Sequence, residues 1–291
     1  MNLKGLGVAM VTPFTEEGQV DYNALPAVVE NITTGRADYI VLMGTTAEVA
    51  CLTAEEKREV IKTVVALNQN KVPLVIGIGG NNTAQVVDEI LHTDLSPFQA
   101  ILSVSPYYNK PTQEGIYQHY KKIVAASPLP IIVYNVPSRT GAGIEVDTFV
   151  RLANDFESII GIKEASGEMS QAENLIKKSP SRIQVISGED SLNLPMLLAG
   201  AVGTISVLGN ALPVSIVKMF HYVAEGDLKK AYELHYQLLD LVSLLFEEGN
   251  PVGIKALLET LSICKKTVRL PLVSASPELA RKIEKSLEAA L

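Results

Sequence analysis

Residues 159–165 read IIGIKEA, an apolar run in which Lys163 is the one cationic side chain. An almost unbroken row of Val, Ile and Leu is typical of a strand buried on both faces of a parallel sheet. Comparable runs occur at residues 7–12, 39–43, 74–78, 100–104, 131–134, 183–187 and 203–206. Together with residues 159–163, these runs predict eight parallel strands.

Helical patterns separate the predicted strands. One begins near Thr53, which has Glu56 three residues on, as in a capping box, and another follows Thr83. Eight strand–helix units in 291 residues indicate the α/β class and a (β/α)8 TIM barrel. We expect the barrel over residues 1–224 and a C-terminal extension over 225–291, with helices at about 225–247, 251–264 and 277–290. An open, doubly wound sheet is the alternative, but no glycine fingerprint follows the first strand.

The composition excludes several classes of protein. A net charge of −7 and a pI near 5.3 argue against a nucleic-acid partner. Two cysteines and four histidines without metal-ligand spacing predict no metal site and no disulfide framework, and fit a reducing cytoplasm. We expect no signal peptide. The uncharged stretch 192–217 is long enough to cross a membrane, but its Gly, Pro and Asn residues predict short buried elements instead.

The polar residues lie where a barrel carries its active site, at the carboxyl ends of the strands. GTTAE occupies residues 44–48, PYYNKP 106–111, YNVPSRTG 134–141 and SGED 187–190, while Lys163 ends the sixth strand. Apolar surroundings favour the neutral form of a lysine amine, which can attack a ketone to form a Schiff base. Lys163 is therefore the predicted nucleophile; the alternative is a strand-end lysine paired with Glu164.

These motifs, with SPYYNKPTQEG at 105–115 and GIKEASG at 161–167, follow the order and spacing of the dihydrodipicolinate synthases. The chain resembles this family over nearly its whole length, within the Schiff-base-forming class I pyruvate aldolases that include N-acetylneuraminate lyase. The resemblance implies that Lys163 condenses with pyruvate and that the enamine adds to L-aspartate 4-semialdehyde. The product would be 4-hydroxy-tetrahydrodipicolinate, for diaminopimelate and lysine synthesis, with no cofactor beyond the covalent pyruvate imine.

The resemblance also implies roles for other side chains. Tyr134 would shuttle protons, and Thr45 would link it to Tyr108, which reaches in from a neighbouring subunit of a homo-oligomer, usually a tetramer built as a dimer of dimers. Thr45 and Thr46 would hold the carboxylate of pyruvate, and Arg139 that of the semialdehyde. Gly188 and the carbonyl of Ile205 would line the same pocket, although Gly188 could also be an ordinary turn glycine.

Two departures from the family pattern, Ala47 and the sequence SVLGN at 206–210, replace no group that carries chemistry. A third departure concerns feedback inhibition by lysine. Gln85 stands where a glutamate is typical of inhibited members, so a partner for the α-ammonium of the effector is lost. Lys57 would place a positive charge near the positively charged ε-ammonium of the effector. We therefore expect weak or no inhibition by lysine. The residues that match the effector pocket of inhibited members are Val49, Ala50, Ala54, Lys57, Asn81, Gln85 and Tyr107.

Two other functions stay open at this point. A related pyruvate-dependent aldolase would cleave N-acetylneuraminate or a 2-keto-3-deoxy sugar acid, although Arg139 within PSRTG favours the amino-acid substrate. A non-catalytic barrel that binds a keto acid is the more remote alternative.

Overall fold

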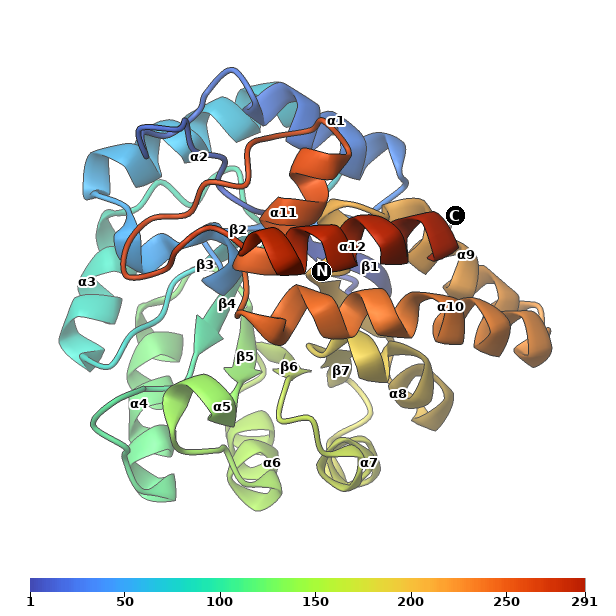
Figure 1. The fold of residues 1–291 in the computed structure, drawn as a ribbon. Coiled ribbons are helices and arrows are strands. Elements are labelled where there is room, and N and C mark those ends of the chain that lie inside the picture. The colour runs from blue at the N-terminus through green and yellow to red at the C-terminus, as the bar shows by residue number, and fades with distance from the viewer. Residues whose placement is uncertain (291) are drawn as a thin grey trace. The chain divides into compact units, whose positions relative to one another are not determined.

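The computed structural model describes residues 1–290. Within them, strands β1 to β8 follow one another in chain order around a closed, parallel barrel, so the predicted TIM barrel is confirmed (Figure 1). Every residue of β2 and β5 is buried, as expected for strands covered on both faces. The strands are β1 Gly5–Ala9, β2 Tyr39–Leu42, β3 Leu74–Gly77, β4 Ala100–Val104, β5 Ile131–Asn135, β6 Ile159–Glu164, β7 Gln184–Ser187 and β8 Gly203–Ser206.

Helices separate consecutive strands and follow the last one. The α-helices are α1 Leu25–Thr34, α2 Ala54–Asn68, α3 Thr83–His92, α4 Gln113–Ala126, α5 Pro137–Thr140, α6 Val146–Asp155, α7 Met169–Lys178, α8 Asn193–Ala199, α9 Pro213–Ala224, α10 Leu228–Glu247, α11 Val252–Thr260 and α12 Pro277–Ala290. Short 3-10 turns are η1 Thr45–Ala47, η2 Val49–Cys51, η3 Asp190–Leu192 and η4 Leu208–Asn210. The capping box predicted at Thr53 and Glu56 is present at the start of α2.

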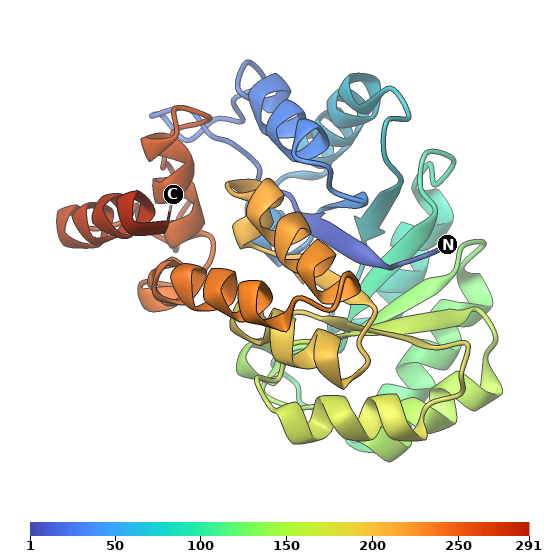
Figure 2. The same cartoon turned by 90° about the vertical axis from the view of Figure 1, so that its right-hand side faces the viewer.

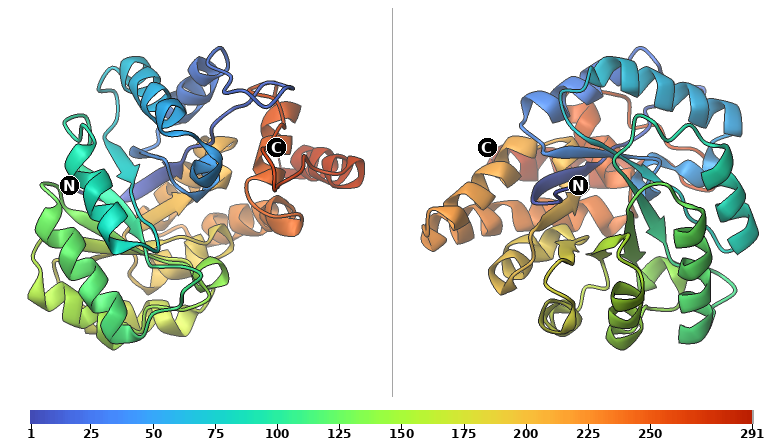
Figure 3. Two further views of the ribbon diagram at one scale, coloured as in Figure 1. Left: turned by 90° about the vertical axis from the view of Figure 1, so that its left-hand side faces the viewer. Right: turned by 180° about the vertical axis from the view of Figure 1, so that it is seen from behind.

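The chain divides into two compact units. The first unit comprises Met1–Lys4 and Pro73–Ile205, and in it β4, β5, β6 and β7 pair in parallel. Its helices pack against their neighbours in the order α3, α4, α6, α7 and α8 (Figure 3). This arrangement brings the carboxyl ends of the strands, and the loops that follow them, to one edge of the sheet.

The second unit comprises Gly5–Val72 and the chain from residue 206 onward. β1 pairs with β2 through Gly7 and Tyr39. Helix α10 packs against α9, α11 and α12, so the predicted C-terminal helices are present (Figures 1 and 2). The boundary that we expect between residues 224 and 225 stays a prediction.

The first strand and one C-terminal helix differ from their predicted bounds. β1 ends at Ala9 and not at residue 12, because the N–H of Val11 donates to the side chain of Asn210 at 3.0 Å and not to a neighbouring strand. Helix α11 ends at Thr260 and not near residue 264. Two residues after this end, Ser262 takes a left-handed backbone conformation with a φ of 58°, which an α-helix does not continue through. The apolar pattern contains neither the Asn210 contact nor the backbone turn at Ser262.

The uncharged stretch 192–217 forms the short elements that its Gly and Pro residues predict. It contains the end of η3, then α8, β8, η4 and the start of α9. Across residues 1–290, no helix has both the length and the apolar character needed to cross a membrane.

Candidate active site

Lys163 and Tyr134 lie side by side at the carboxyl ends of β6 and β5. The two residues are register partners in the parallel pair, so their side chains leave the sheet on the same face. Both are buried, and Lys163 Nζ lies 4.4 Å from the centroid of the Tyr134 ring. The structure therefore brings together the predicted nucleophile and the predicted proton shuttle.

Glu164 points away from this contact, because successive side chains of a strand alternate between its faces. Its carboxylate accepts hydrogen bonds from Asn135 Nδ2 at 2.9 Å and from the N–H of Ser166 at 2.7 Å. Asn135 Oδ1 in turn accepts from the N–H of Ile144 at 2.9 Å. Among the described residues Glu164 forms no ion pair with Lys163, so the alternative role considered for this lysine is not supported.

Gly188, just after β7, is packed against the lysine side chain. A Cβ added at this position would lie 2.9 Å from both Cε and Cγ of Lys163, and 2.7 Å from the Cβ of Ala165. Such approaches are closer than carbon atoms tolerate. The absence of a side chain at Gly188 therefore leaves the space that the Lys163 side chain occupies, and the place of Gly188 in the substrate pocket stays a prediction.

Glu189 adds a carboxyl group to this part of the first unit, and the sequence reasoning gave it no role. Burial raises the pKa of Glu189, and the charge of Asp190 adds to the effect, while the hydrogen bond from Ser191 and the charge of Lys163 act in the opposite direction. The signal in the sequence was its place in SGED, directly after Gly188.

Arg139 lies in the short helix α5, which is separated from β5 by a single residue, Val136. Gly141 ends this helix with a φ of 71°, a left-handed conformation that favours glycine. A Cβ on Gly141 would lie 2.8 Å from Cε of Lys110, and Gln113 Nε2 donates to the carbonyl of Gly143 at 2.9 Å. The motifs at 105–115 and 134–141 are therefore neighbours in the first unit.

The loop after β4 presents two phenols to solvent. Tyr107 is 40% exposed and Tyr108 is 88% exposed. Tyr108 also has a φ of 70°, which is costly for a residue with a side chain. Asn109 ties the loop to the turn before α3 by donating from Nδ2 to the carbonyl of Asn81 at 3.0 Å. A ring held outward in this way packs against little of its own chain.

In the second unit, GTTAE forms the 3-10 turn η1. The turn is closed by the N–H of Ala47, which donates to Gly44, and by that of Glu48, which donates to Thr45. The N–H groups of Thr45 and Thr46 precede these bonds and do not take part in them. The buried hydroxyl of Thr46 accepts from Asn250 Nδ2 at 3.1 Å, which leaves its own proton available for donation.

The remaining predicted residues are divided between the units. Ile205, in β8, is buried and is the last residue of the first unit. The predicted link from Thr45 through Tyr134 to Tyr108 joins residues of both units and stays a prediction. The same holds for the effector pocket, of which Val49, Ala50, Ala54 and Lys57 belong to the second unit and Asn81, Gln85 and Tyr107 to the first.

The part of the chain that the structure describes contains no group of three His, Cys, Asp or Glu side chains placed to hold a metal ion. That neither a metal nor a cofactor takes part in the reaction stays a prediction. The chemistry that the described residues offer is that of an amine beside a phenol, with hydroxyl and amide donors in a separate turn.

Known proteins resemble this chain along almost its entire length. The model of the dihydrodipicolinate synthetase family matches residues 2–290. A 4-hydroxy-tetrahydrodipicolinate synthase from Flavobacterium psychrophilum is 49% identical over 96% of each chain.

Solved structures agree with this result. A dihydrodipicolinate synthase from Aquifex aeolicus superimposes with a TM-score of 0.93 at 40% identity, covering 98% of this chain and 97% of that one. A chloride-inhibited dihydrodipicolinate synthase from Acinetobacter baumannii, complexed with pyruvate, has a TM-score of 0.94 at 36% identity over 99% of each chain.

Proposed function

The chain belongs to the dihydrodipicolinate synthetase family, and from this premise we infer that it catalyses the 4-hydroxy-tetrahydrodipicolinate synthase reaction. The enzyme is a lyase that joins pyruvate to L-aspartate 4-semialdehyde on the route to diaminopimelate and lysine. The relatives named above are synthases, which favours this activity over cleavage of N-acetylneuraminate or a 2-keto-3-deoxy sugar acid. The observation that carries the proposal is the amine of Lys163 beside the ring of Tyr134.

Lys163 starts the reaction as the nucleophile. Its neutral amine adds to C2 of pyruvate, and loss of water gives an imine whose positive nitrogen withdraws electrons from C3. Loss of a proton from C3 yields the enamine, which attacks the aldehyde carbon of the semialdehyde. The amine of the semialdehyde then adds to C2 and expels Lys163, which closes the ring and restores the free enzyme.

Tyr134 moves the protons in this scheme, since its phenol is held on the strand next to Lys163. Thr45 and Thr46 bind the carboxylate of pyruvate through their N–H and hydroxyl groups. Arg139 binds the carboxylate of the semialdehyde, for which a planar guanidinium fork is well suited. Gly188 gives the lysine side chain room, and Ile205 contributes its carbonyl to the same site.

We further propose that the active enzyme is a homo-oligomer, a tetramer built as a dimer of dimers. In it Tyr108 of one subunit completes the proton relay of a neighbour through Thr45. The 88% exposure of Tyr108 and its left-handed backbone support this role, because a ring so placed is available to a partner. The free thiols of Cys51 and Cys264 fit a cytoplasmic enzyme.

The experiment that tests this function combines trapping with turnover. Pyruvate and borohydride should add mass at Lys163 and inactivate the enzyme, and pyruvate with aspartate semialdehyde should turn over faster than either class of sugar acid is cleaved. Lys163→Ala should abolish both results and keep the fold. The matched control is Lys178→Ala, which removes an exposed lysine of the first unit and its ion pair with Asp147. Absence of the adduct would favour a keto-acid-binding barrel without catalysis.

A further inference from the structure

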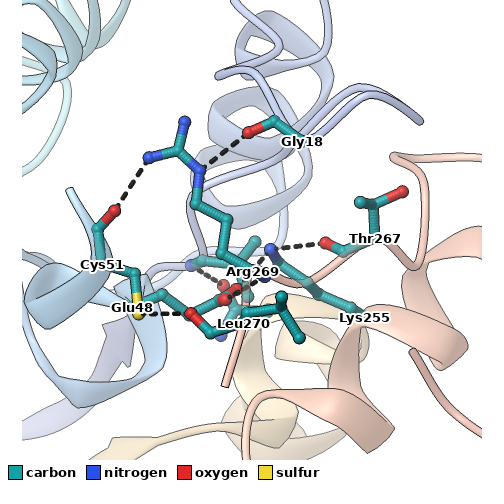
Figure 4. Close-up of polar contacts among 9 residues, drawn as sticks. Gly18, Glu48, Cys51, Lys255, Thr267, Arg269 and Leu270 are labelled. Atoms are coloured by element: carbon teal, nitrogen blue, oxygen red, sulfur yellow. Dashed lines mark hydrogen bonds and ion pairs between the residues drawn. The ribbon is translucent and has the colours of Figure 1, made fainter. Parts of the chain in front are cut away.

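Glu48, the last residue of GTTAE, is buried and anchored at both of its carboxylate oxygens. Oε1 accepts from Lys255 Nζ at 2.6 Å, and Oε2 accepts from the N–H of Arg269 at 2.9 Å (Figure 4). Its backbone is left-handed, with φ of 54°. A glutamate in this conformation is unfavourable by itself. The contacts of its side chain therefore hold the chain direction directly after η1.

Lys255 is the partner that makes this anchor unusual. It lies on α11, its side chain is 0% exposed, and it also donates to the carbonyl of Thr267 at 2.9 Å and lies 4.0 Å from the centroid of the Phe14 ring. Burial lowers the pKa of Lys255, while the charge of Glu48 acts against that shift. A buried ion pair is a poor source of net stability compared with apolar packing, so its value lies in the geometry that it specifies.

A second contact joins the same turn to the same part of the chain. Asn250, two residues before α11, donates to the hydroxyl of Thr46. The segment that begins α11 therefore contacts η1 at Thr46 and again just after it at Glu48, on either side of Ala47. Two contacts at fixed spacing determine both the position and the rotation of a turn.

Arg269 fastens the chain that follows. Its guanidinium donates to Glu56 at the start of α2, and to the carbonyls of Gly18 and Cys51 at 2.7 and 2.9 Å. The hydrogen bonds from Arg269 lower the pKa of Glu56 to about 2. The segment from Thr46 to Glu56 is thus connected to residues 250–269 at both of its ends. Figure 4 shows the contacts between these ends, which Glu48 and Cys51 make with Lys255 and Arg269.

We propose that Glu48 and Lys255 are positioning residues, whose buried ion pair holds Thr45 and Thr46 in the arrangement that captures the carboxylate of pyruvate. This inference rests on the proposed function. Neither charged group contacts the reacting atoms in this scheme. Their effect passes through the turn, and the C-terminal helices become part of the machinery that binds the first substrate.

The test measures pyruvate capture separately from stability. For each variant, borohydride trapping at Lys163 is recorded over a range of pyruvate concentrations, and the melting temperature is measured beside it. Lys255→Met should raise the pyruvate concentration for half-maximal trapping on the order of tenfold or more. Trapping at saturating pyruvate should stay close to that of the unmodified chain, because Lys163 itself is unchanged.

Two further variants separate positioning from folding. Leu258→Ala creates a cavity at a buried position of the same helix and leaves both Glu48 and Lys255 in place. It should therefore lower the melting temperature and leave the pyruvate concentration for half-maximal trapping unchanged. The double variant Glu48→Gln with Lys255→Met removes both charges. It should recover stability relative to Lys255→Met, because no unpaired charge stays buried, yet keep the weakened capture of pyruvate.

The inference is overturned if Lys255→Met traps pyruvate at the concentrations that suffice for the unmodified chain. It is also overturned if half-maximal trapping follows the melting temperature across all variants, Leu258→Ala included. Failure of the unmodified chain to trap pyruvate at all would instead refute the proposed function, so the two failures are distinguishable.

Discussion

Gly188→Ala is expected to impair the reaction of Lys163 far more than it impairs folding. The new methyl carbon would lie 2.9 Å from Cε and Cγ of Lys163. Unstrained carbon contacts are about 3.5–4.0 Å, so the lysine or the methyl must move by roughly 0.6 Å or more. Ala165, 2.7 Å from the same point, blocks one direction of escape. The flexible lysine side chain is therefore displaced.

The size of the effect follows from that displacement. A misplacement of about 1 Å at a reacting group can cost about 100-fold in rate, so we expect kcat/KM to fall on the order of 10- to 100-fold. Overpacking of this kind destabilises a protein by about 1–3 kcal/mol, which is less than the total stability of about 5–15 kcal/mol that is typical of folded proteins. The measurements are the rate of borohydride trapping with pyruvate and the steady-state rate of synthesis.

A matched control uses a glycine of the same unit. In Gly80→Ala the added methyl would lie 3.3 Å from Cγ2 of Val86, a contact that a small shift relieves, and trapping should be unchanged. If Gly188→Ala forms the imine as fast as the unmodified chain, the reasoning from the space beside Lys163 is wrong.

Other predictions concern pH, assembly and regulation. Burial lowers the pKa of His119 to about 4, below its value of about 6.5 in the unfolded chain. The contribution of neutral His119 to the free energy of unfolding is therefore fully present at pH 7. It is lost as the pH falls from about 6.5 to about 4, by about 1.4 kcal/mol per pH unit. Urea unfolding at pH 7 and pH 5 measures this loss. Between the two pH values, His119→Gln should lose less free energy of unfolding than the unmodified chain, whereas replacement of the exposed His92 should not reduce the loss. Inactive Lys163→Ala and Tyr108→Phe subunits, unfolded together and reassembled, should regain up to about a quarter of full activity, because mixed dimers contain one intact site; no recovery would contradict a shared site. Lysine at submillimolar concentration should not half-inhibit synthesis, and Gln85→Glu should increase sensitivity if the missing carboxylate is the reason.

The strands could be predicted from the sequence because burial on both faces of a parallel sheet demands a local pattern. The run at 159–165 is apolar almost throughout, and β6 forms there with Lys163 near its end. The same alternation of strands and helices predicted the barrel, and the order of the polar motifs indicated the family. Each single strand, helix or motif signal lies within a few residues of chain, and the barrel and the family follow from the order of these signals, so no knowledge of distant contacts was needed.

The ends of elements and the role of several side chains were decided by tertiary structure. β1 stops early because the side chain of Asn210, far along the chain, takes the N–H of Val11. The close packing of Gly188 against the Lys163 side chain appears only in the tertiary structure. A sequence pattern does not state which distant group fills a given space.

The pairing of Glu48 with Lys255 shows the same division most clearly. Lys255 is a lone cation in the apolar run VGIKALLET at 252–260, the same kind of signal as Lys163 in IIGIKEA. The sequence shows each lysine within an apolar run, and the structure shows that both are buried. Only the fold decided which lysine faces a phenol and which faces a carboxylate 207 residues away, because the partner of a buried charge is chosen by distance in space.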